Sequence, residues 1–553
     1  MTTRARRRLR RIEGPGEPGL GAVDVVVRPA KREEVMPLAL AAVAVAFVAL
    51  IVCVTKGYLL LYGDAVAHLG IARRILDTRN PGLIQLGGVW LPLPHLLMLP
   101  FVQRLDWWQN GLAGAWPSLL CFVLSVVGFY RLARRLVPPA WALVATSFYG
   151  LNPNLLYLST TAMTEPLFLA IIIWTTLLTM ECVSAIRTGK VKAVNRKLLL
   201  LGLLIMAAVF TRYDGWIFGA TVWCLVAWQL YRSSIKQQVT AGFAIFTLLA
   251  VAGPVMWLAY NQHFFHDPLD FMRGPYSAAA IEKRTTPPGS HHYPGWHAPV
   301  CAAVLYMRTS QLDAAAWETG FVVAALAFAG VVLVVRKRLE LSALLLWVPL
   351  PFYIYSIAFG SVPIFIPPLP PHSYYNSRYG MEMLPAFAVF AALTLAWLQE
   401  RLLEKRPLTA RLMQPIVLFL LAANVVTMMY RIPLVLKEAK ANSTSRMSFE
   451  GAIARELVSF PSGSTILMYN SDHVGALQQA GIPLKQTISE TDYDTWKVAL
   501  AAPAQHAAYV VAIDGDPVSA AVKERPEGLS ELVVLCSTGQ PCARVYRSER
   551  FTN

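Results

Sequence analysis

The chain of 553 residues combines 56% hydrophobic residues with only 15% charged ones, and its mean hydropathy is positive. These proportions exclude an ordinary soluble globular protein and indicate a chain that crosses a membrane several times. The formal net charge is +16, but no basic surface module with interleaved aromatic residues is visible. We therefore expect membrane topology and contact with anionic lipids to account for the positive charge, and we expect no nucleic-acid partner.

Apolar runs long enough for the roughly 30 Å hydrocarbon core of a bilayer recur along the chain. The two runs flanking "FTRYDGW" are short, so they predict either one long bent helix or two helices joined by a tight turn. About eleven transmembrane helices are predicted, at residues 36–54, 111–130, 139–158, 165–183, 198–211, 216–230, 240–260, 318–335, 341–358, 379–398 and 412–430.

Basic segments alternate with these runs and set the expected orientation, because short cytoplasmic loops are enriched in Lys and Arg. With eleven spans, "RARRRLRR", "RTGKVKAVNRK" and "ERLLEKRPLTAR" all lie on one side. We therefore expect a multi-pass protein of the cell (inner or plasma) membrane with a cytoplasmic N-terminus. A cleaved signal peptide with "AVA" at 65–67 as its cleavage site is the competing interpretation, but the first run is too long and many spans follow.

The first outer stretch, "LYGDAVAHLGIARRILD", carries ionisable residues at the end of a predicted span. Such residues are costly at a membrane boundary unless they pair or face water, which makes them functional candidates. His68 follows Asp64 by four residues and shares its helical face. Arg73 and Arg74 continue an amphipathic helix over the membrane surface, and we expect them to contact lipid headgroups.

Three later outer turns supply the other candidates. Glu165 in "TTAMTEPLF" is either a functional acid or a capping acid at a helix N-terminus, and Arg212 and Asp214 in "TRYDGW" either pair with each other or bind a ligand. Arg378 in "HSYYNSRYG" is either an interfacial anchor or a bidentate phosphate ligand. The tyrosines expected to line the same substrate site are Tyr374, Tyr375 and Tyr379.

Acids, arginines and tyrosines on one membrane boundary fit sugar transfer from a lipid phosphate. A carboxylate could take the proton of an incoming hydroxyl while an arginine stabilises the departing phosphate, so no protein nucleophile is required. The leading alternative is a transporter or flippase of lipid-linked sugars, which inverted repeats would support. The outer segment 261–317 holds His291, His292 and His297 without an acid or Cys at ligand spacing, so we expect a loop that closes over substrate there and no metal site.

The segment after residue 431 reads as a separate domain. Helical patterns alternate with strand-like runs such as "AAYVVAI" and "ELVVLC", which predicts a small α/β fold with a largely parallel sheet. Cys536 and Cys542 in "CSTGQPC" are spaced for an extracytoplasmic disulfide. The predicted domains are a basic cytoplasmic segment at 1–35, a transmembrane domain at 36–431 and an extracytoplasmic α/β domain at 432–553, which we expect to recognise the acceptor or serve as a scaffold.

As an ordered set, "GDAVAHLGIARRILD", "GGVWLPLPHLLMLPF", "TTAMTEPLF", "FTRYDGW" and "NSRYGMEMLP" resemble the C-type glycosyltransferases, nearest to bacterial relatives of the dolichyl-phosphate-mannose protein mannosyltransferases. The resemblance covers roughly residues 36–430. It implies a multispan fold with an extracytoplasmic cavity, a polyprenyl-phosphate sugar donor, an acceptor in the cell envelope that is protein, lipid or glycan, and inversion at the anomeric carbon.

Carried over by position, the resemblance gives Asp64 the role of the essential acid and general base of the first outer loop. Glu165 matches the acidic position of the second outer loop, and Arg378 matches the basic residue near the donor phosphate. Asp64 is followed by Ala65, whereas many of these enzymes have two adjacent acids there. No cofactor is assigned, and this departure leaves open whether a divalent metal binds between Asp64 and Glu165.

Overall fold

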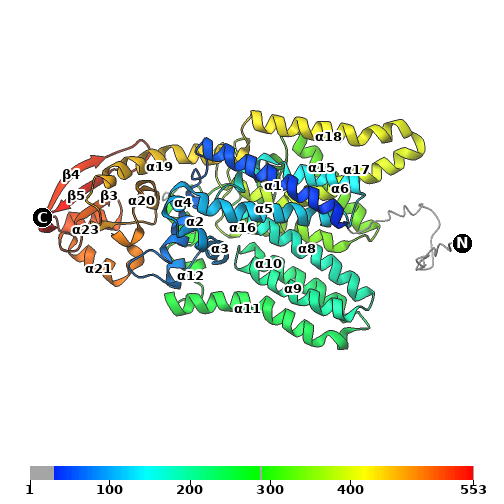
Figure 1. The fold of residues 1–553 in the computed structure, drawn as a ribbon, viewed down its shortest axis with the longest axis horizontal. Helices are drawn as coiled ribbons and strands as arrows, with labels where there is room; N and C mark the ends of the chain where they lie inside the picture. The colour runs from blue at the N-terminus through cyan, green and yellow to red at the C-terminus, as the bar shows by residue number, and fades with distance from the viewer. Residues whose placement is uncertain (1–29, 287–288, 290, 552–553) are drawn as a thin grey trace.

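The computed structural model describes residues 30–286, 289 and 291–551. A helical region makes up most of its long axis, and a small sheet with its own helices lies at one end (Figure 1). This arrangement confirms the predicted fold class of a polytopic helical domain followed by a small C-terminal α/β domain. Most of the predicted basic N-terminal segment lies outside the described residues.

The predicted apolar runs all coincide with helices. In the described part of the chain, eight helical segments are long and apolar enough to cross a membrane. The runs at 139–158, 198–211 and 216–230 are helical but are not among those eight, so the number of spans stays a prediction. The helices of the runs are α1 (Arg32–Thr55), α5 (Leu112–Ala133), α6 (Pro139–Gly150), α8 (Glu165–Arg187), α9 (Val191–Val209), α10 (Asp214–Tyr231), α11 (Thr240–Phe265), α15 (Thr319–Arg336), η3 (Leu341–Trp347) with α16 (Pro349–Phe359), α17 (Leu384–Lys405) and α18 (Pro407–Tyr430).

Two of the runs are interrupted for local reasons. At "FTRYDGW", α9 ends at Val209 and α10 begins at Asp214, which selects the interpretation of two helices joined by a tight turn. The run 139–158 divides at Asn152, whose side chain accepts hydrogen bonds from the backbone N–H groups of Asn154 and Leu155 at 2.9 and 3.2 Å. With Pro153 in the first turn, this cap starts the short helix α7 (Pro153–Leu158).

Short helices fill the segments between the runs, and all but η2 lie on the side of the sheet. One of them is 16 residues long and lies inside the segment that the sequence predicted as an outer loop. This helix, α14, contacts α16 and η4, so tertiary packing stabilises it. The connecting helices are α2 (Gly63–Arg74), η1 (Leu83–Leu86), α3 (Leu93–Val102), α4 (Leu105–Asn110), η2 (Lys236–Val239), α12 (Asp270–Arg273), α13 (Ala278–Thr285), α14 (Pro299–Ala314) and η4 (Ser377–Met383).

The C-terminal sheet has the order β2-β1-β3-β5-β4. Strand β1 pairs in parallel with β2 and β3, whereas β5 pairs antiparallel with β3 and β4. The expectation of a largely parallel sheet is therefore wrong for its second half, because β4 and β5 form a hairpin closed by the predicted Cys536–Cys542 disulfide. The elements are α19 (Leu434–Val458), β1 (Ile466–Met468), α20 (Val474–Ala480), η5 (Leu484–Gln486), β2 (Thr487–Ile488), η6 (Glu490–Asp492), α21 (Asp494–Ala501), α22 (Pro503–His506), β3 (Tyr509–Ile513), α23 (Pro517–Glu524), β4 (Leu529–Leu535), β5 (Ala543–Ser548) and η7 (Glu549–Phe551).

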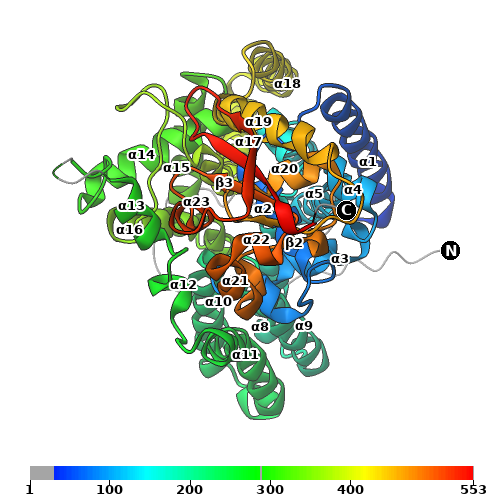
Figure 2. The same ribbon diagram turned by 90° about the vertical axis from the view of Figure 1, so that its left-hand side faces the viewer.

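The sheet region packs against the helices that follow α1, and Figure 2 shows it in front of α2, α3 and α4. Gln478 donates to the carbonyl of Trp108 at 2.6 Å, and Gln109 donates to the carbonyl of Gln479 at 3.0 Å. Arg79 adds a bond to the carbonyl of Thr487 at 2.9 Å. These bonds run in both directions across the junction, so the two regions are held in one arrangement.

Arg73 is buried and Arg74 is partly buried, and both bond to backbone carbonyls, so the expectation that they contact lipid headgroups is wrong. Arg73 forms an ion pair with Asp77 at 2.7 Å and donates to the carbonyl of Val102 at 2.5 Å. Arg74 donates to the carbonyl of Gln85 at 2.5 Å. Helix α2 is covered by α3 and α20, so its basic residues stabilise the fold by bonding to carbonyl groups that would otherwise be unpaired.

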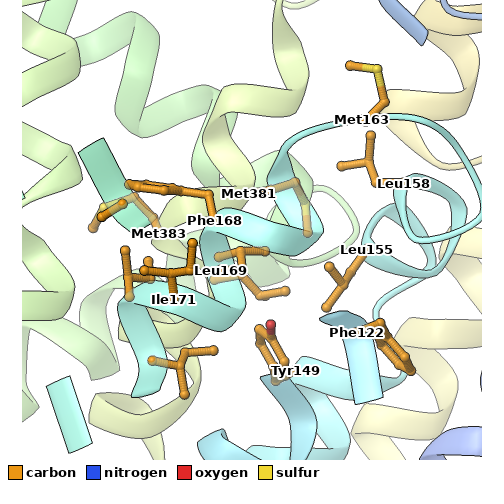
Figure 3. Packing of buried hydrophobic residues seen from close by; sticks show 14 of the residues in the cluster. Phe122, Tyr149, Leu155, Leu158, Met163, Phe168, Leu169, Ile171, Met381 and Met383 are labelled. Carbon is orange, nitrogen blue, oxygen red and sulfur yellow. The ribbon is translucent and has the colours of Figure 1, made fainter. Parts of the chain in front are cut away.

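The apolar core between α5, α6, α8 and η4 supports the end of the helical region that faces the C-terminal domain. Figure 3 shows Phe122 and Tyr149 facing Leu155, while Phe168 lies near Met383. Met381 and Met383 belong to η4, and Phe168 lies in the first turn of α8. The polar residues that alternate with them, described next, are therefore held by a closely packed layer.

Candidate active site

A cavity of about 1540 Å³ lies between the ends of α8, α10 and α16 that face the C-terminal domain and the segments α2, α12, α13 and η4. Its walls combine charged groups with many aromatic and aliphatic side chains. It is large enough for a ligand bigger than a single sugar. The predicted site residues that line it are Asp64, His68, Glu165, Arg212, Asp214, Tyr375, Arg378 and Tyr379.

The backbone places each charged residue at a helix end. Asp64 lies in the first turn of α2 and Glu165 is the first residue of α8. Arg212 lies in the turn before α10, and Asp214 is the first residue of α10, where its carboxylate accepts from the backbone N–H of Gly215 at 2.9 Å. Arg378 belongs to η4.

Arg378 joins three carboxylates. Its Nη2 atom lies 2.5 Å from Asp64 Oδ2, its Nε atom lies 3.2 Å from Glu165 Oε1, and its Nη1 atom lies 3.6 Å from Glu438 Oε1. The Arg378 side chain is only 7% exposed, and its guanidinium also lies 4.8 Å from the Tyr379 ring centroid. A buried guanidinium in such surroundings remains charged and fixed in orientation.

Arg212 forms a second junction at the same oxygen of Glu165 that Arg378 contacts. It lies 3.3 Å from Glu165 Oε1, 3.2 Å from Asp214 Oδ2 and 3.2 Å from Glu382 Oε1. It also donates to Tyr353 Oη at 2.6 Å. The predicted Arg212–Asp214 pair is therefore present, but it is one part of a network that passes through Glu165 to Arg378.

The five carboxylates of this network differ in accessibility. The Asp64 side chain is 42% exposed, whereas that of Glu165 is fully buried and that of Glu438 is 2% exposed. Glu165 makes its described hydrogen bonds to the two arginines, so its contacts go beyond those of a helix-capping acid. Asp64 is the acid of this network that a second substrate can reach most readily.

Three members of the network were missed from the sequence. Glu382 was quoted within "NSRYGMEMLP" but not selected, and Tyr353 lies inside an apolar run. Glu438 lies on α19, after the last predicted span, and accepts from the backbone N–H groups of Asn376 and Ser377 at 3.0 and 2.7 Å. An acid spaced four residues from an arginine is a signal for Glu382, but only the tertiary fold reveals Glu438.

A glycine allows η4 to approach α14 closely. A Cβ atom on Gly380 would lie 2.6 Å from Asp313 Oδ2 and 2.8 Å from the backbone nitrogen of Ser310. Burial raises the pKa of Asp313 well above its usual range, which favours the neutral form of this acid beneath the network. Gly380 thus sets the distance at which Arg378 and Glu382 stand from the helices behind them.

Tyr374 is the predicted site residue that does not line the cavity. Its carbonyl accepts from the side chain of Asn442 at 3.2 Å. Tyr375 lines the cavity and lies 6.0 Å from Phe365 between ring centroids. Of the three predicted tyrosines, Tyr375 and Tyr379 therefore line the site and Tyr374 does not.

The donor atoms for a divalent metal are limited in the described residues. No group of three or more His, Cys, Asp or Glu side chains that could hold a metal ion occurs among them. Asp64 and Glu165 both contact Arg378, and Glu165 Oε2 has no hydrogen-bond partner. Two carboxylates suit a hard divalent cation only if substrate oxygens and water complete its coordination.

The predicted histidine loop contributes to the cavity wall through His291 and His292. His292 Nδ1 lies 2.7 Å from Glu282 Oε1, and its ring stacks on Trp296 with centroids 4.5 Å apart. His297 instead packs edge-on against Phe359 at 5.5 Å. The three histidines therefore do not converge, and closure of this loop over substrate stays a prediction.

Comparisons with known proteins agree with this architecture. Residues 92–257 match the family model described as dolichyl-phosphate-mannose-protein mannosyltransferase. No functionally curated protein matches the sequence. The structure is similar to that of ArnT from Cupriavidus metallidurans bound to undecaprenyl phosphate, with 14% identity, coverage of 93% of this chain and 98% of that chain, and a TM-score of 0.53.

The same protein in its apo state has 15% identity, coverage of 92% and 97%, and a TM-score of 0.53. Archaeal oligosaccharyltransferase AglB from Archaeoglobus fulgidus has 11% identity, coverage of 94% and 74%, and a TM-score of 0.44, which is too low to support an argument. The matched segment and the shared architecture agree with the predicted resemblance: the chain is a multi-pass membrane protein that shares the fold of ArnT, and its residues 92–257 resemble the dolichyl-phosphate-mannose-protein mannosyltransferases.

Proposed function

We propose that the protein transfers one sugar from a polyprenyl-phosphate-linked donor to an acceptor outside the membrane. The observation that carries this proposal is the exposed Asp64 carboxylate held 2.5 Å from the buried Arg378 guanidinium in the wall of the large cavity. This pair supplies a proton acceptor and an anion-binding group side by side. The description of the matching family and the lipid in the ArnT structure support a polyprenyl-phosphate donor.

The cavity wall offers separate surfaces for the two parts of such a donor. Arg378 and Arg212 are its buried cationic groups for the phosphate. Ile217, Tyr355 and Phe359 also line the cavity, and all three are exposed. An apolar wall that reaches the outer surface of membrane helices suits an isoprenoid chain extending into the bilayer.

In the proposed reaction, Asp64 accepts the proton of an acceptor hydroxyl as that oxygen attacks the anomeric carbon of the donor. The bond between the anomeric carbon and the phosphate oxygen breaks, and its electron pair leaves with the polyprenyl phosphate. Arg378 stabilises the charge on the departing phosphate, while Glu165 holds Arg378 and Arg212 in place. Attack opposite the leaving group inverts the anomeric centre.

The Asp64–Arg378 pair also suggests an order of binding. Arg378 directs its Nη2 group to Asp64, so a phosphate that binds this guanidinium competes with the carboxylate. Donor binding would release Asp64 toward the acceptor, because the phosphate takes over the cation. We therefore propose that the donor binds before the acceptor and prepares the base.

The remaining assignments follow from this proposal. The cavity faces the outside of the cell membrane, the N-terminus lies in the cytoplasm, and residues 432–553 form an extracytoplasmic domain above the transmembrane domain of residues 36–431. A mannose-like hexose is the proposed sugar, on the description of the matching family. The acceptor is a hydroxyl-bearing protein, lipid or glycan of the cell envelope.

The test is release of polyprenyl phosphate from a radiolabelled polyprenyl-phosphate sugar by purified protein in detergent. Asp64→Asn should bind the donor but lose turnover by about a hundred- to ten-thousand-fold, the usual contribution of a general base. Asp106→Asn is the matched control, because Asp106 is 58% exposed and pairs only with the neighbouring Arg104 in the described structure.

Two results would contradict the proposal. Unchanged turnover in Asp64→Asn would remove Asp64 from the chemistry. Wild-type protein that releases no polyprenyl phosphate with any donor and acceptor tried, yet moves the intact lipid across a vesicle membrane, would establish a transporter instead.

A further inference from the structure

A pair of histidines lies beside the charged network. His68 Nδ1 and His95 Nε2 are 2.8 Å apart and share one hydrogen bond between α2 and α3. His68 is 7% exposed, and His95 is fully buried. The His68 ring packs on Trp90 with centroids 4.2 Å apart, and both His68 and Trp90 line the cavity.

Both rings are neutral at physiological pH. Burial lowers the pKa of His68 to about 3, and the nearby charges of Arg378 and Arg212 act in the same direction. Burial also lowers the pKa of His95 well below its usual range. Because a neutral imidazole carries one N–H group, only one of the two rings donates the shared hydrogen bond.

The charges beside His68 indicate which ring donates. His68 Nδ1 lies against His95, so Nε2 is the nitrogen of His68 left for the cavity, which Arg378 and Arg212 also line. Two guanidinium cations favour a lone pair over an N–H group on the side of the ring that faces them. His68 Nδ1 then donates to His95 Nε2, and His68 Nε2 carries a lone pair.

We propose that His68 Nε2 and the Trp90 ring form a subsite for a sugar ring, in which Nε2 accepts a hydrogen bond from a sugar hydroxyl. His95 is the positioning residue that fixes the tautomer of His68. This subsite rests on the proposed function and divides the cavity between two kinds of chemistry. A phosphate without a proton cannot donate to Nε2, so it binds on the arginine side, and the hydroxyl groups lie on the histidine side.

Trp90 suits the second requirement of a sugar subsite. An aromatic face provides a flat apolar surface for the C–H groups of a pyranose, while a neighbouring acceptor selects the direction of its hydroxyls. Trp90 and His95 are also nearly parallel, with an interplanar angle of 7° and centroids 6.4 Å apart. The three rings thus brace one another, which keeps the Nε2 lone pair in a fixed position.

The first experiment measures the tautomer without any substrate. Nitrogen-15 NMR of histidine-labelled full-length protein should show His68 with a protonated Nδ1 and an unprotonated Nε2 from pH 5.5 to 8, with the signal assigned by its loss in His68→Gln. In His95→Phe, His68 loses its acceptor and the proton should move to Nε2. A protonated Nε2 in the wild-type protein would overturn the proposal, whether or not His95→Phe folds.

The second experiment separates sugar from phosphate recognition. His68→Ala should bind undecaprenyl phosphate as tightly as wild type but raise the KM for a polyprenyl-phosphate sugar by roughly three- to tenfold, the usual effect of one neutral hydrogen bond. His68→Gln should recover part of this loss through its carbonyl oxygen, and exposed His263 provides the matched control His263→Gln.

Weaker binding of undecaprenyl phosphate by His68→Ala would place the phosphate at His68 and refute the subsite. Failure of the wild-type protein to bind undecaprenyl phosphate would instead refute the proposed donor, and the tautomer measurement would still decide the state of His68.

Discussion

Replacing Glu438 with Gln tests whether α19 holds the arginine segment of the site. Glu438 accepts from the backbone N–H groups of Asn376 and Ser377 at 3.0 and 2.7 Å and from the Ser377 hydroxyl at 2.5 Å. It also lies 3.6 Å from Arg378. Gln has the same shape but only one carbonyl oxygen. That oxygen can replace one of the two carboxylate oxygens as an acceptor, and the NH₂ group in the place of the other meets a donor with which it cannot form a hydrogen bond.

The size of the effect follows from these contacts. Hydrogen bonds to a charged group contribute about 1.5–3 kcal/mol each, and Gln loses at least one of them. A loss of about 3 kcal/mol from two such bonds corresponds to about a hundredfold change in an equilibrium constant. The segment around residues 376–378 should therefore open about a hundred times more often in Glu438→Gln.

Hydrogen exchange followed by mass spectrometry measures this opening directly. Peptides that contain Asn376 and Ser377 should exchange about a hundredfold faster in Glu438→Gln than in wild type, because exchange reports the free energy of local opening. Peptides of α8 should change little. Glu404→Gln is the control, since Glu404 is exposed at the end of α17. Equal exchange in Glu438→Gln and this control would refute the idea that α19 fixes the site.

Four further results are expected. Arg378→Lys keeps the charge but loses the planar fork, so donor affinity should fall in a binding assay while the protein stays folded. Unchanged affinity and turnover in Arg378→Ala would leave this residue only a structural partner of the three carboxylates. Asp64 and Glu165 could share a divalent cation with the oxygens of the donor phosphate. If they do, chelation of divalent cations should lower turnover and their return should restore it, whereas equal turnover with chelator would exclude such a metal. A cysteine introduced at Asp514 should react with an impermeant reagent from outside, whereas one at Lys192 should not, and labelling at Lys192 would overturn the eleven-span topology. Burial raises the pKa of Asp516 to about 6. The contribution of this group to stability is therefore present below its ordinary pKa and is lost as pH rises through about 6. Peptides of α23 should open more easily at pH 8 than at pH 5, and Asp516→Asn should remove this difference.

The helical part of the fold was predictable because each membrane helix is encoded by a local apolar run. Local sequence did not predict the elements that are stabilised by segments distant in the chain. Helix α14 mixes polar and apolar residues and is stabilised by α16 and η4. The antiparallel half of the sheet depends on the hairpin of β4 and β5, and short strand runs carry no signal for the direction of pairing.

The candidate site divides in the same way. Asp64, Glu165 and Arg378 could be selected because an ionisable residue beside an apolar run has few structural explanations. Arg73 has the same sequence context, yet it bonds to Asp77 inside the protein. Sequence context therefore identifies residues that need a polar partner, but it does not say whether a substrate or the fold supplies that partner.

Sequence context has this limit because a membrane determines only how deep such residues lie. The end of an apolar run places Asp64, Glu165 and Arg378 at one membrane boundary, and this depth can be inferred from the sequence directly. Their positions within the boundary plane depend on which helices pack together and how closely. At Gly380 that distance is set by the absence of a side chain facing α14. The missed Glu438 reaches the same plane from α19, a helix that mixes polar and apolar residues, so neither depth nor lateral position could be inferred for it. The sequence at the ends of the spans therefore indicates which residues belong to the site. The geometry of the site, and with it the choice of substrate, depends on the contacts between the helices.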